Sequence, residues 1–178
     1  LGQVLAAQNG VFLNTDESVV GDEKTTVYEY AAPTDQASNI ISLVKSKILL
    51  DATGEEVNRQ NTYYDNLALG RVNKGNATRE SYLPLGANYL KTYNAYGLLT
   101  LSRDPLNRQT RISYDAVNYY PRLTTNPLNQ STQTDYDLLT GQVKRKVDPN
   151  GLIQEADFDP FGRILQSRKT NPNSNQLL

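Results

Sequence analysis

The amino-acid sequence predicts an all-β protein made of antiparallel β-hairpin repeats with a period of about 22 residues. Three observations predict this class. The chain has 12 Tyr but 3 Phe, and it is rich in Asn and Thr, a composition that suits half-buried strands joined by tight turns. Nothing longer than a few residues carries an apolar stripe of helical period. Turn residues also recur along the chain in two ladders that share one spacing.

The first ladder consists of aromatic residues and the second of prolines. Successive members lie 21, 22 and 22 residues apart in both ladders, and each aromatic follows its proline by nine residues. The aromatic ladder is Tyr93, Tyr114, Tyr136 and Phe158; the proline ladder is Pro84, Pro105, Pro127 and Pro149. Two ladders in one constant phase indicate a single repeating unit, which consists of a strand, a Pro turn, a second strand and an aromatic–Asp turn.

The Pro turns have the composition of type I turns followed by a left-handed residue. In Asp148-Pro149-Asn150-Gly151, Asp148 can accept a bond from nearby backbone, Pro149 pre-sets φ, and Gly151 tolerates φ > 0. Such a turn is a three-residue hairpin loop with a bulge. The same reading applies to Asp104-Pro105 and to Pro127. These residues are therefore predicted to have a structural role in the repeat.

The aromatic turns raise a question of chemistry, because an acid follows the aromatic at Asp115, Asp137 and Asp159. In two repeats an acid also precedes it, giving the triplets 135–137 and 157–159. Strand alternation would place both acids of a triplet opposite the aromatic, where they could hold a metal or act as an acid/base pair. However, the second acid recurs in phase with the turns, and Asn94 takes its place once. The pattern favours turn capping.

The segments 141–147 and 152–158 between these turns are predicted strands, each of seven residues and spanning about 23 Å. A three-residue loop at 149–151 pairs Asp148 with Leu152 and puts Arg145 opposite Glu155, where a structural ion pair is expected. A parallel β-helix has a similar period and remains the rival fold. The antiparallel meander is favoured because two hairpin-type turns occur in every period.

The period loosens towards the N-terminus, so residues 1–92 are predicted to be an irregular β region continuous with the regular repeats of 93–178. Residues 25–30 alternate like a strand, residues 50–54 resemble another turn, and 66–81 contain an insertion of about eight residues. The chain starts at Leu1 rather than Met, and its last predicted turn, at 171–174, lies four residues from its end. We therefore expect it to be a segment of a longer protein.

Composition excludes several classes of function. With 18 basic and 19 acidic residues the chain has no basic excess, so no nucleic-acid partner is expected. The absence of Cys and His excludes Cys–His and Ser–His–Asp catalysis and the usual zinc and haem ligands. The most apolar run, 40–50, is interrupted by Lys45 and Lys47 and is too short to cross a bilayer. We predict no cofactor, no metal and no catalytic residue.

The two ladders resemble the RHS/YD-repeat family, whose unit reads approximately YD-x-x-G-R-L…D-P-x-G. The resemblance is most specific in TYYDNLALGRVNKGN (62–76), YDAVNYYPRLTTNPLNQ (114–130) and YDLLTGQVKRKVDPNGL (136–152), which look like the repeats of the B component of insecticidal toxin complexes. The unit YDAVNYYPR lacks the turn Gly, and Phe158 replaces Tyr. The family's self-cleaving aspartates lie in a motif that we do not find here, so none is assigned.

What the resemblance implies is a scaffold without catalytic activity, in which a curved, spiralling sheet forms a hollow shell around a toxic C-terminal polypeptide. The expected partners are the remaining shell repeats of the parent chain or of a partner C component, together with the enclosed toxin. The expected location is secreted or extracellular.

Two other functions remain open from the residues themselves. An extracellular glycan- or cell-surface-binding module would use Tyr rings in grooves with polar partners, whereas a shell wall needs Tyr packed between strands. An enzyme would need acids such as Asp16, Glu17, Asp22 and Glu23, but no motif supports it. The glycosylation patterns at Asn76 and Asn129 are attributed to chance.

Overall fold

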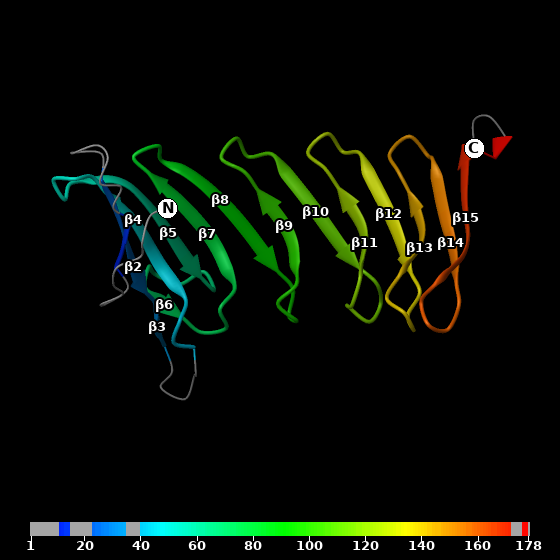
Figure 1. Cartoon of the computed structure of the whole chain (residues 1–178), viewed down its shortest axis with the longest axis horizontal. Helices are drawn as coiled ribbons and strands as arrows, with labels where there is room; N and C mark the ends of the chain where they lie inside the picture. The colour runs from blue at the N-terminus through cyan, green and yellow to red at the C-terminus, as the bar shows by residue number, and fades with distance from the viewer. Residues whose placement is uncertain (1–10, 15–22, 35–39, 172–175, 178) are drawn as a thin grey trace. The chain divides into compact units, whose positions relative to one another are not determined.

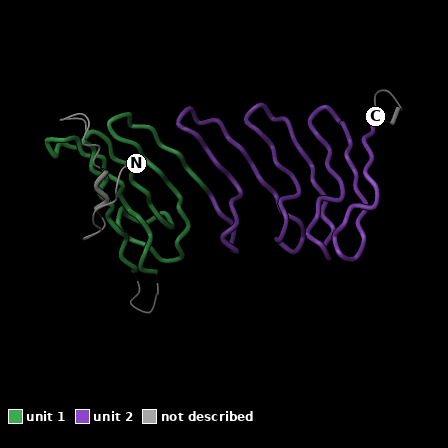
Figure 2. Tube along the Cα trace, in the orientation of Figure 1, with its two compact units in different colours: residues 1–91 green, residues 92–178 purple. Residues whose placement is uncertain are grey.

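A computed structural model of the chain describes residues 11–14, 23–34, 40–171 and 176–177. Its regular elements are all β-strands, and its pairings in the main sheet are antiparallel, so the predicted fold class is confirmed and the parallel β-helix is wrong. The chain divides into two compact units, residues 1–91 and 92–178 (Figure 2). Within the described residues no helix is long and apolar enough to cross a membrane.

The first unit contains an antiparallel sheet in the order β1-β2-β4-β5-β7-β8. Its strands are β1 (Val11–Asn14), β2 (Lys24–Tyr30), β4 (Val44–Leu50), β5 (Glu56–Tyr64), β7 (Ala77–Leu83) and β8 (Ala87–Tyr93), the last of which runs on into the second unit. The short strands β3 (Ala32–Pro33) and β6 (Arg71–Val72) pair in parallel. The predicted Pro84 turn follows β7, and its Leu83–Pro84 peptide is cis.

The core of the first unit is small and depends on the insertion between β5 and β7. Val72, which β6 contributes, is fully buried against Ala31 and Tyr64, and Leu43 packs against this cluster. The Tyr64 hydroxyl donates a hydrogen bond of 2.9 Å to the carbonyl of Val44, which satisfies the polar end of a buried ring. The insertion therefore folds back to cover apolar residues instead of forming a free loop.

The second unit is an antiparallel meander in which each strand pairs with the next (Figure 1). Its strands are β9 (Leu99–Arg103), β10 (Gln109–Tyr114), β11 (Pro121–Thr125), β12 (Ser131–Tyr136), β13 (Val143–Val147), β14 (Ile153–Phe158), β15 (Ile164–Asn171) and β16 (Gln176–Leu177). Arg145 pairs with Glu155, as the three-residue loop predicts. The predicted strand 141–147 is shorter, because Gly141 and Gln142 belong to the preceding turn.

None of residues 92–171 is buried; each is half-buried or exposed. Residues directly opposite on neighbouring antiparallel strands share a face of the sheet. One face of β12–β15 carries Asp135, Arg145, Glu155 and Arg168 in register, and the other carries Thr134, Lys146, Gln154 and Lys169. Both faces of this part of the sheet are therefore polar, and the strands are held together by their ladder hydrogen bonds and cross-strand side-chain pairs.

Candidate functional site: the repeat turns and a charge ladder

The turns of the second unit form two rows, one at each end of its strands (Figure 1). The lower turn row comprises residues 94–98, 115–120, 137–142 and 159–163; the upper turn row comprises 104–108, 126–130 and 148–152. In every one of these turns the first residue is Asp or Asn. The two predicted ladders thus mark the two ends of the strands, where the turns lie.

In all of these turns, the side chain of the first residue accepts hydrogen bonds from backbone N–H groups of the turn. In the turn at Asp148, Oδ1 accepts the backbone N–H of Asn150 and of Leu152, both at 2.9 Å, and Gly151 has φ = 83°. An oxygen of the first side chain accepts two backbone N–H groups in eight turns, those starting at Asp51, Asn94, Asp104, Asp115, Asn126, Asp137, Asp148 and Asp159. The aromatic turns at Asn94 and Asp159 therefore share one hydrogen-bonding pattern with the Pro turns at Asp104, Asn126 and Asp148, which the sequence ladders did not reveal.

The left-handed position of each turn is filled by Gly or Asn, because other side chains resist φ > 0. The unit YDAVNYYPR has no Gly there, and Asn118 takes the position with φ = 57°. Asn107 and Asn129 do the same in two Pro turns, where Pro105 and Pro127 occupy the second turn position. Asn therefore supplies the left-handed residue of this turn in place of the Gly of the family pattern.

The four aromatics of the first ladder lie at the ends of strands, and each is half-buried. Tyr93 ends β8 and Phe158 ends β14. The Tyr114 hydroxyl donates to the carbonyl of Leu99 at 2.9 Å, and the Tyr136 ring stacks on Tyr120 with centroids 4.5 Å apart. These two rings are engaged within the sheet.

Two neighbouring turns of the lower row are one residue longer than the others. The N–H of Asp115 bonds to the carbonyl of Tyr120, and that of Asp137 to Gln142, a separation of five residues instead of four. Between these turns lies an open cavity of about 290 Å³, which we call the Tyr120 hollow; its apolar walls are Val117, Tyr120, Tyr136 and Leu138. The extra residue, Tyr119 in the first of the turns, is visible in the sequence as an aromatic–Asp turn that is one residue longer than that at Asn94.

The structure separates the acids of each triplet. The pairing register shifts between Asp135 and Tyr136, and again between Asp157 and Phe158, so simple alternation fails at these points. Asp137 and Asp159 accept backbone N–H groups inside turns, whereas Asp135 and Asp157 pair with arginines on the sheet. Among the described residues, no group of three or more acids gathers where it could hold a metal ion.

The pKa values of two acids of the lower turn row, Asp137 and Asp159, are lowered. The backbone N–H and the hydroxyl of Thr140 lower the pKa of Asp137 from its ordinary value. The backbone N–H of Arg163 lowers the pKa of Asp159, and the guanidinium of the same residue adds to the effect. A general acid needs a raised pKa to keep its proton near neutral pH. This geometry therefore suits turn capping and opposes proton donation.

An ion-pair ladder crosses five strands of the second unit, and the sequence predicted only its central rung. Arg145 lies 3.5 Å from Glu155 and 3.7 Å from Asp135. The outer rungs are Arg122–Asp135 at 3.3 Å, Arg168–Glu155 at 3.6 Å and Arg168–Asp157 at 3.0 Å. The side chains of Arg145 and its partners are about one-third exposed, so each rung contributes about 0.2–1 kcal/mol. The ladder contains three arginines and three acids and is electrically balanced.

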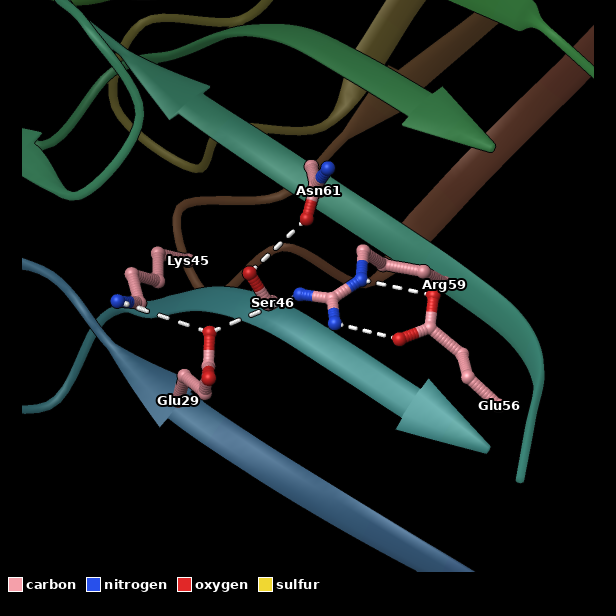
Figure 3. Close-up of polar contacts among 6 residues, drawn as sticks. All are labelled: Glu29, Lys45, Ser46, Glu56, Arg59 and Asn61. Atoms are coloured by element: carbon pink, nitrogen blue, oxygen red, sulfur yellow. Dashed lines mark hydrogen bonds and ion pairs between the residues drawn. The ribbon is translucent and has the colours of Figure 1, made fainter. Parts of the chain in front are cut away.

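A second charged cluster lies on β2, β4 and β5 of the first unit (Figure 3). Glu29 is 3.6 Å from Lys45 and 3.9 Å from Arg59. Arg59 also binds Glu56 through two nitrogens, and this guanidinium holds the pKa of Glu56 below its usual range. Beside the cluster, the Ser46 hydroxyl donates to the Asn61 side-chain oxygen at 2.9 Å, so both buried groups are satisfied. The cluster is a cross-strand network without a pair of opposed carboxylates.

Asp65, which lies in the YD-like stretch 62–76, organises the insertion, a role that the sequence did not predict. Its Oδ2 accepts the N–H groups of Asn73, Lys74 and Gly75, and Oδ1 accepts that of Asn76, at 2.7–3.0 Å. Partial burial would raise the pKa of Asp65, but the four donors outweigh it and lower the pKa. Of the acids considered for an enzyme, Asp16, Glu17 and Asp22 lie outside the described residues.

No family model matches the chain, and no curated protein matches its sequence. Solved structures do match its fold. The Photorhabdus luminescens Tc holotoxin pore with the mutation TccC3-D651A is 16% identical, with a TM-score of 0.56, over 94% of this chain and 8% of that chain. TcdB2-TccC3 with Cdc42 is 15% identical, with a TM-score of 0.57, over 94% of this chain and 9% of that one.

The chain thus spans less than a tenth of the length of these toxin proteins. At such low identity the likeness establishes the fold, and it does so independently of the turn ladders that resemble RHS/YD repeats. By fold, the chain is a β-repeat sheet of the kind found within the Tc toxin proteins, in agreement with its RHS/YD-type turns.

Proposed function

We propose that this chain is a non-catalytic structural segment of an RHS-repeat shell, which encloses a toxic polypeptide in a secreted toxin complex. The observation that carries the proposal is the sheet of the second unit, in which none of residues 92–171 is buried and both faces of β12–β15 carry a row of polar residues in register. A sheet that packs on a core has one apolar face. A sheet with two wetted faces suits a wall between two aqueous spaces.

The chemistry of the turns and ladders supports the same role. The acids of the repeat act as hydrogen-bond acceptors in turns or as partners of arginine, and the pKa values of Asp137 and Asp159 are lowered. The partners of such a wall are the remaining repeats of the parent chain, or those of a partner C component, and the polypeptide inside. The fold likeness to Tc toxin proteins favours a secreted toxin complex over other uses of a β-repeat wall.

The test uses the full-length parent protein with Pro149→Ala and Gly151→Val combined. The change removes the fixed φ of Pro149 and places a β-branched residue at φ = 83°, so the hairpin of β13 and β14 should open. We expect an enclosed polypeptide, resistant to protease in the parent, to become cleavable. The control is Gly151→Asn, because Asn fills the same position in other turns. A parent with no protease-protected polypeptide would refute the proposal.

The alternative function, a glycan- or cell-surface-binding module, has less support from the geometry. Tyr114 uses its hydroxyl in a bond to the backbone of Leu99, so its ring is engaged within the sheet. Tyr120 and Tyr136 do line the Tyr120 hollow, but the walls of the hollow are mainly apolar, and Arg122 and Asp135 beside it pair with each other. An oligosaccharide array separates the two functions. Specific binding that is lost in Tyr136→Ala but kept in Tyr96→Ala would favour the glycan module over the wall.

A further inference from the structure

The lower turn row exposes large apolar side chains at its tips. Tyr96 is 75% exposed, Leu139 94% and Phe161 84%, and Val117 and Leu138 are also exposed. Turn tips ordinarily carry Gly, Asn, Asp, Ser or Pro, so these side chains are not required by the turns. An exposed apolar series of this kind marks an interaction surface.

The four turns of the lower row touch one another and so form a continuous ledge. The Asn94 side-chain amide donates to that of Asn118 at 3.2 Å, which joins the first turn to the second. Tyr120 lies so close to Gly141 that a Cβ there would be 3.1 Å from its hydroxyl, which joins the second turn to the third. The Gln142 amide lies 3.4 Å from the carbonyl of Gly162 and joins the third to the fourth.

The ledge contains a cavity as well as exposed apolar side chains. The Tyr120 hollow opens between its two longer turns and has room for a branched aliphatic or benzyl group. Its walls are mainly apolar, and the Arg122–Asp135 pair closes one side. A single exposed apolar side chain is thus the group whose size and polarity match the Tyr120 hollow.

The upper turn row carries exposed apolar side chains of this kind. Leu106 is 73% exposed and Leu128 is 75% exposed, each at the third position of a five-residue turn, and the next tip is the polar Asn150. Successive turns of a row are two strands apart, or about 9.6 Å. Both rows belong to the same meander and therefore have the same spacing between turns. The exposed side chains of one row can therefore meet the turns of the lower row of another copy at matching intervals.

We propose that the lower turn row docks the upper turn row of a second copy of this chain, with a Leu of that row seated in the Tyr120 hollow. The pitch argues for a second copy, because an unrelated surface has no reason to match a spacing set by two strands. The contact is head-to-tail, so a docked pair keeps one free row at each of its two ends and the stack can extend. The docking does not depend on whether the sheet encloses a polypeptide.

The test is the self-association of the 178-residue chain, measured by sedimentation velocity over a wide range of concentration. A row of tips buries less area than a standard interface, so the association is weak and its onset lies at high concentration. Leu106→Ser with Leu128→Ser changes the upper row, and Val117→Ser with Leu138→Ser changes the lower row. Each double variant should associate at least about tenfold more weakly than the parent chain.

The two double variants should complement each other. In an equimolar mixture the intact upper row of one docks on the intact lower row of the other, which gives a 1:1 dimer that cannot extend. Ile41→Ser is the control, since Ile41 is 81% exposed but belongs to neither row, and it should associate like the parent. Circular dichroism checks that each variant is folded.

Three outcomes would overturn the proposal. The parent chain could remain monomeric at every concentration, the mixture could fail to form the 1:1 dimer, or Ile41→Ser could weaken association as much as the row variants. An association abolished only by the lower-row changes would mean that two lower rows meet, and the upper-on-lower assignment would be wrong. None of these outcomes bears on protease protection in the parent protein, so the proposed function is tested separately.

Discussion

Replacing Asp65 with Asn should loosen the insertion between β5 and β7. The carboxylate accepts four backbone N–H groups, three on Oδ2 and one on Oδ1, and an amide side chain has only one acceptor oxygen. At least one bond is lost, and the others lose the strengthening that a charged acceptor gives. Allowing for water at this partly exposed loop, we expect Asp65→Asn to lower its local opening free energy by about 2–3 kcal/mol.

The assay is amide hydrogen exchange read by mass spectrometry, which reports local opening without assuming that the two units unfold together. The amides of 73–76 should exchange about 30- to 140-fold faster in the variant, since about 1.4 kcal/mol corresponds to a factor of ten. Asp148→Asn is the matched control. Asp148 uses a single oxygen for two donors, and Asn94 and Asn126 fill the same role in other turns, so this change should be mild. Unchanged exchange at 73–76, or an equal effect of Asp148→Asn on its own turn, would refute the reasoning.

Three further predictions follow from the same geometry. Because the pKa of Asp65 is lowered in the folded state, its contribution to the stability of the insertion is complete above the ordinary Asp pKa of about 3.9 and is lost as the pH falls below that value. Amide exchange at 73–76, corrected for intrinsic rates, should therefore rise at low pH. The Asp65→Asn variant should not show this rise. Gly151→Val should destabilise the β13–β14 hairpin by about 1–2 kcal/mol in thermal melts, whereas Gly151→Asn should cost less than half of that, and equal losses would contradict the left-handed assignment. Arg145→Ala should cost about 1 kcal/mol at low salt and less at high salt, and Lys146→Ala on the opposite face should lack that salt dependence.

The parts of the fold that sequence predicts well are those set by local, repeated chemistry. Asp148, Pro149 and Gly151 each satisfy a backbone requirement within four residues, so the loop length, and with it the Arg145–Glu155 register, follows without long-range information. The antiparallel meander follows from the same turns. Twenty-two-residue spacing alone would have left the parallel β-helix open.

The parts that sequence missed depend on contacts outside the period. Asp65 is the Asp of an aromatic–Asp pair in the stretch 62–76, but it binds amides eight to eleven residues away in an insertion that occurs once, so the period does not indicate these contacts. The two bulges move Tyr136 and Phe158 out of simple alternation, and alternation was the only rule available for placing the acid triplets. The Tyr120 hollow arises from one added residue in each of two adjacent turns, and it exists only because the meander brings those turns together.

The polar, unburied sheet of the second unit also has a calorimetric consequence. The heat-capacity change on unfolding comes mainly from newly exposed apolar surface, and globular domains gain about 12–15 cal/mol/K per residue. None of residues 92–171 is fully buried, so unfolding exposes less new apolar surface per residue than it does in a packed core, and their gain per residue should be smaller. A smaller heat-capacity change flattens the curve of stability against temperature. This sheet should therefore lose stability only gradually on cooling or warming away from its optimum.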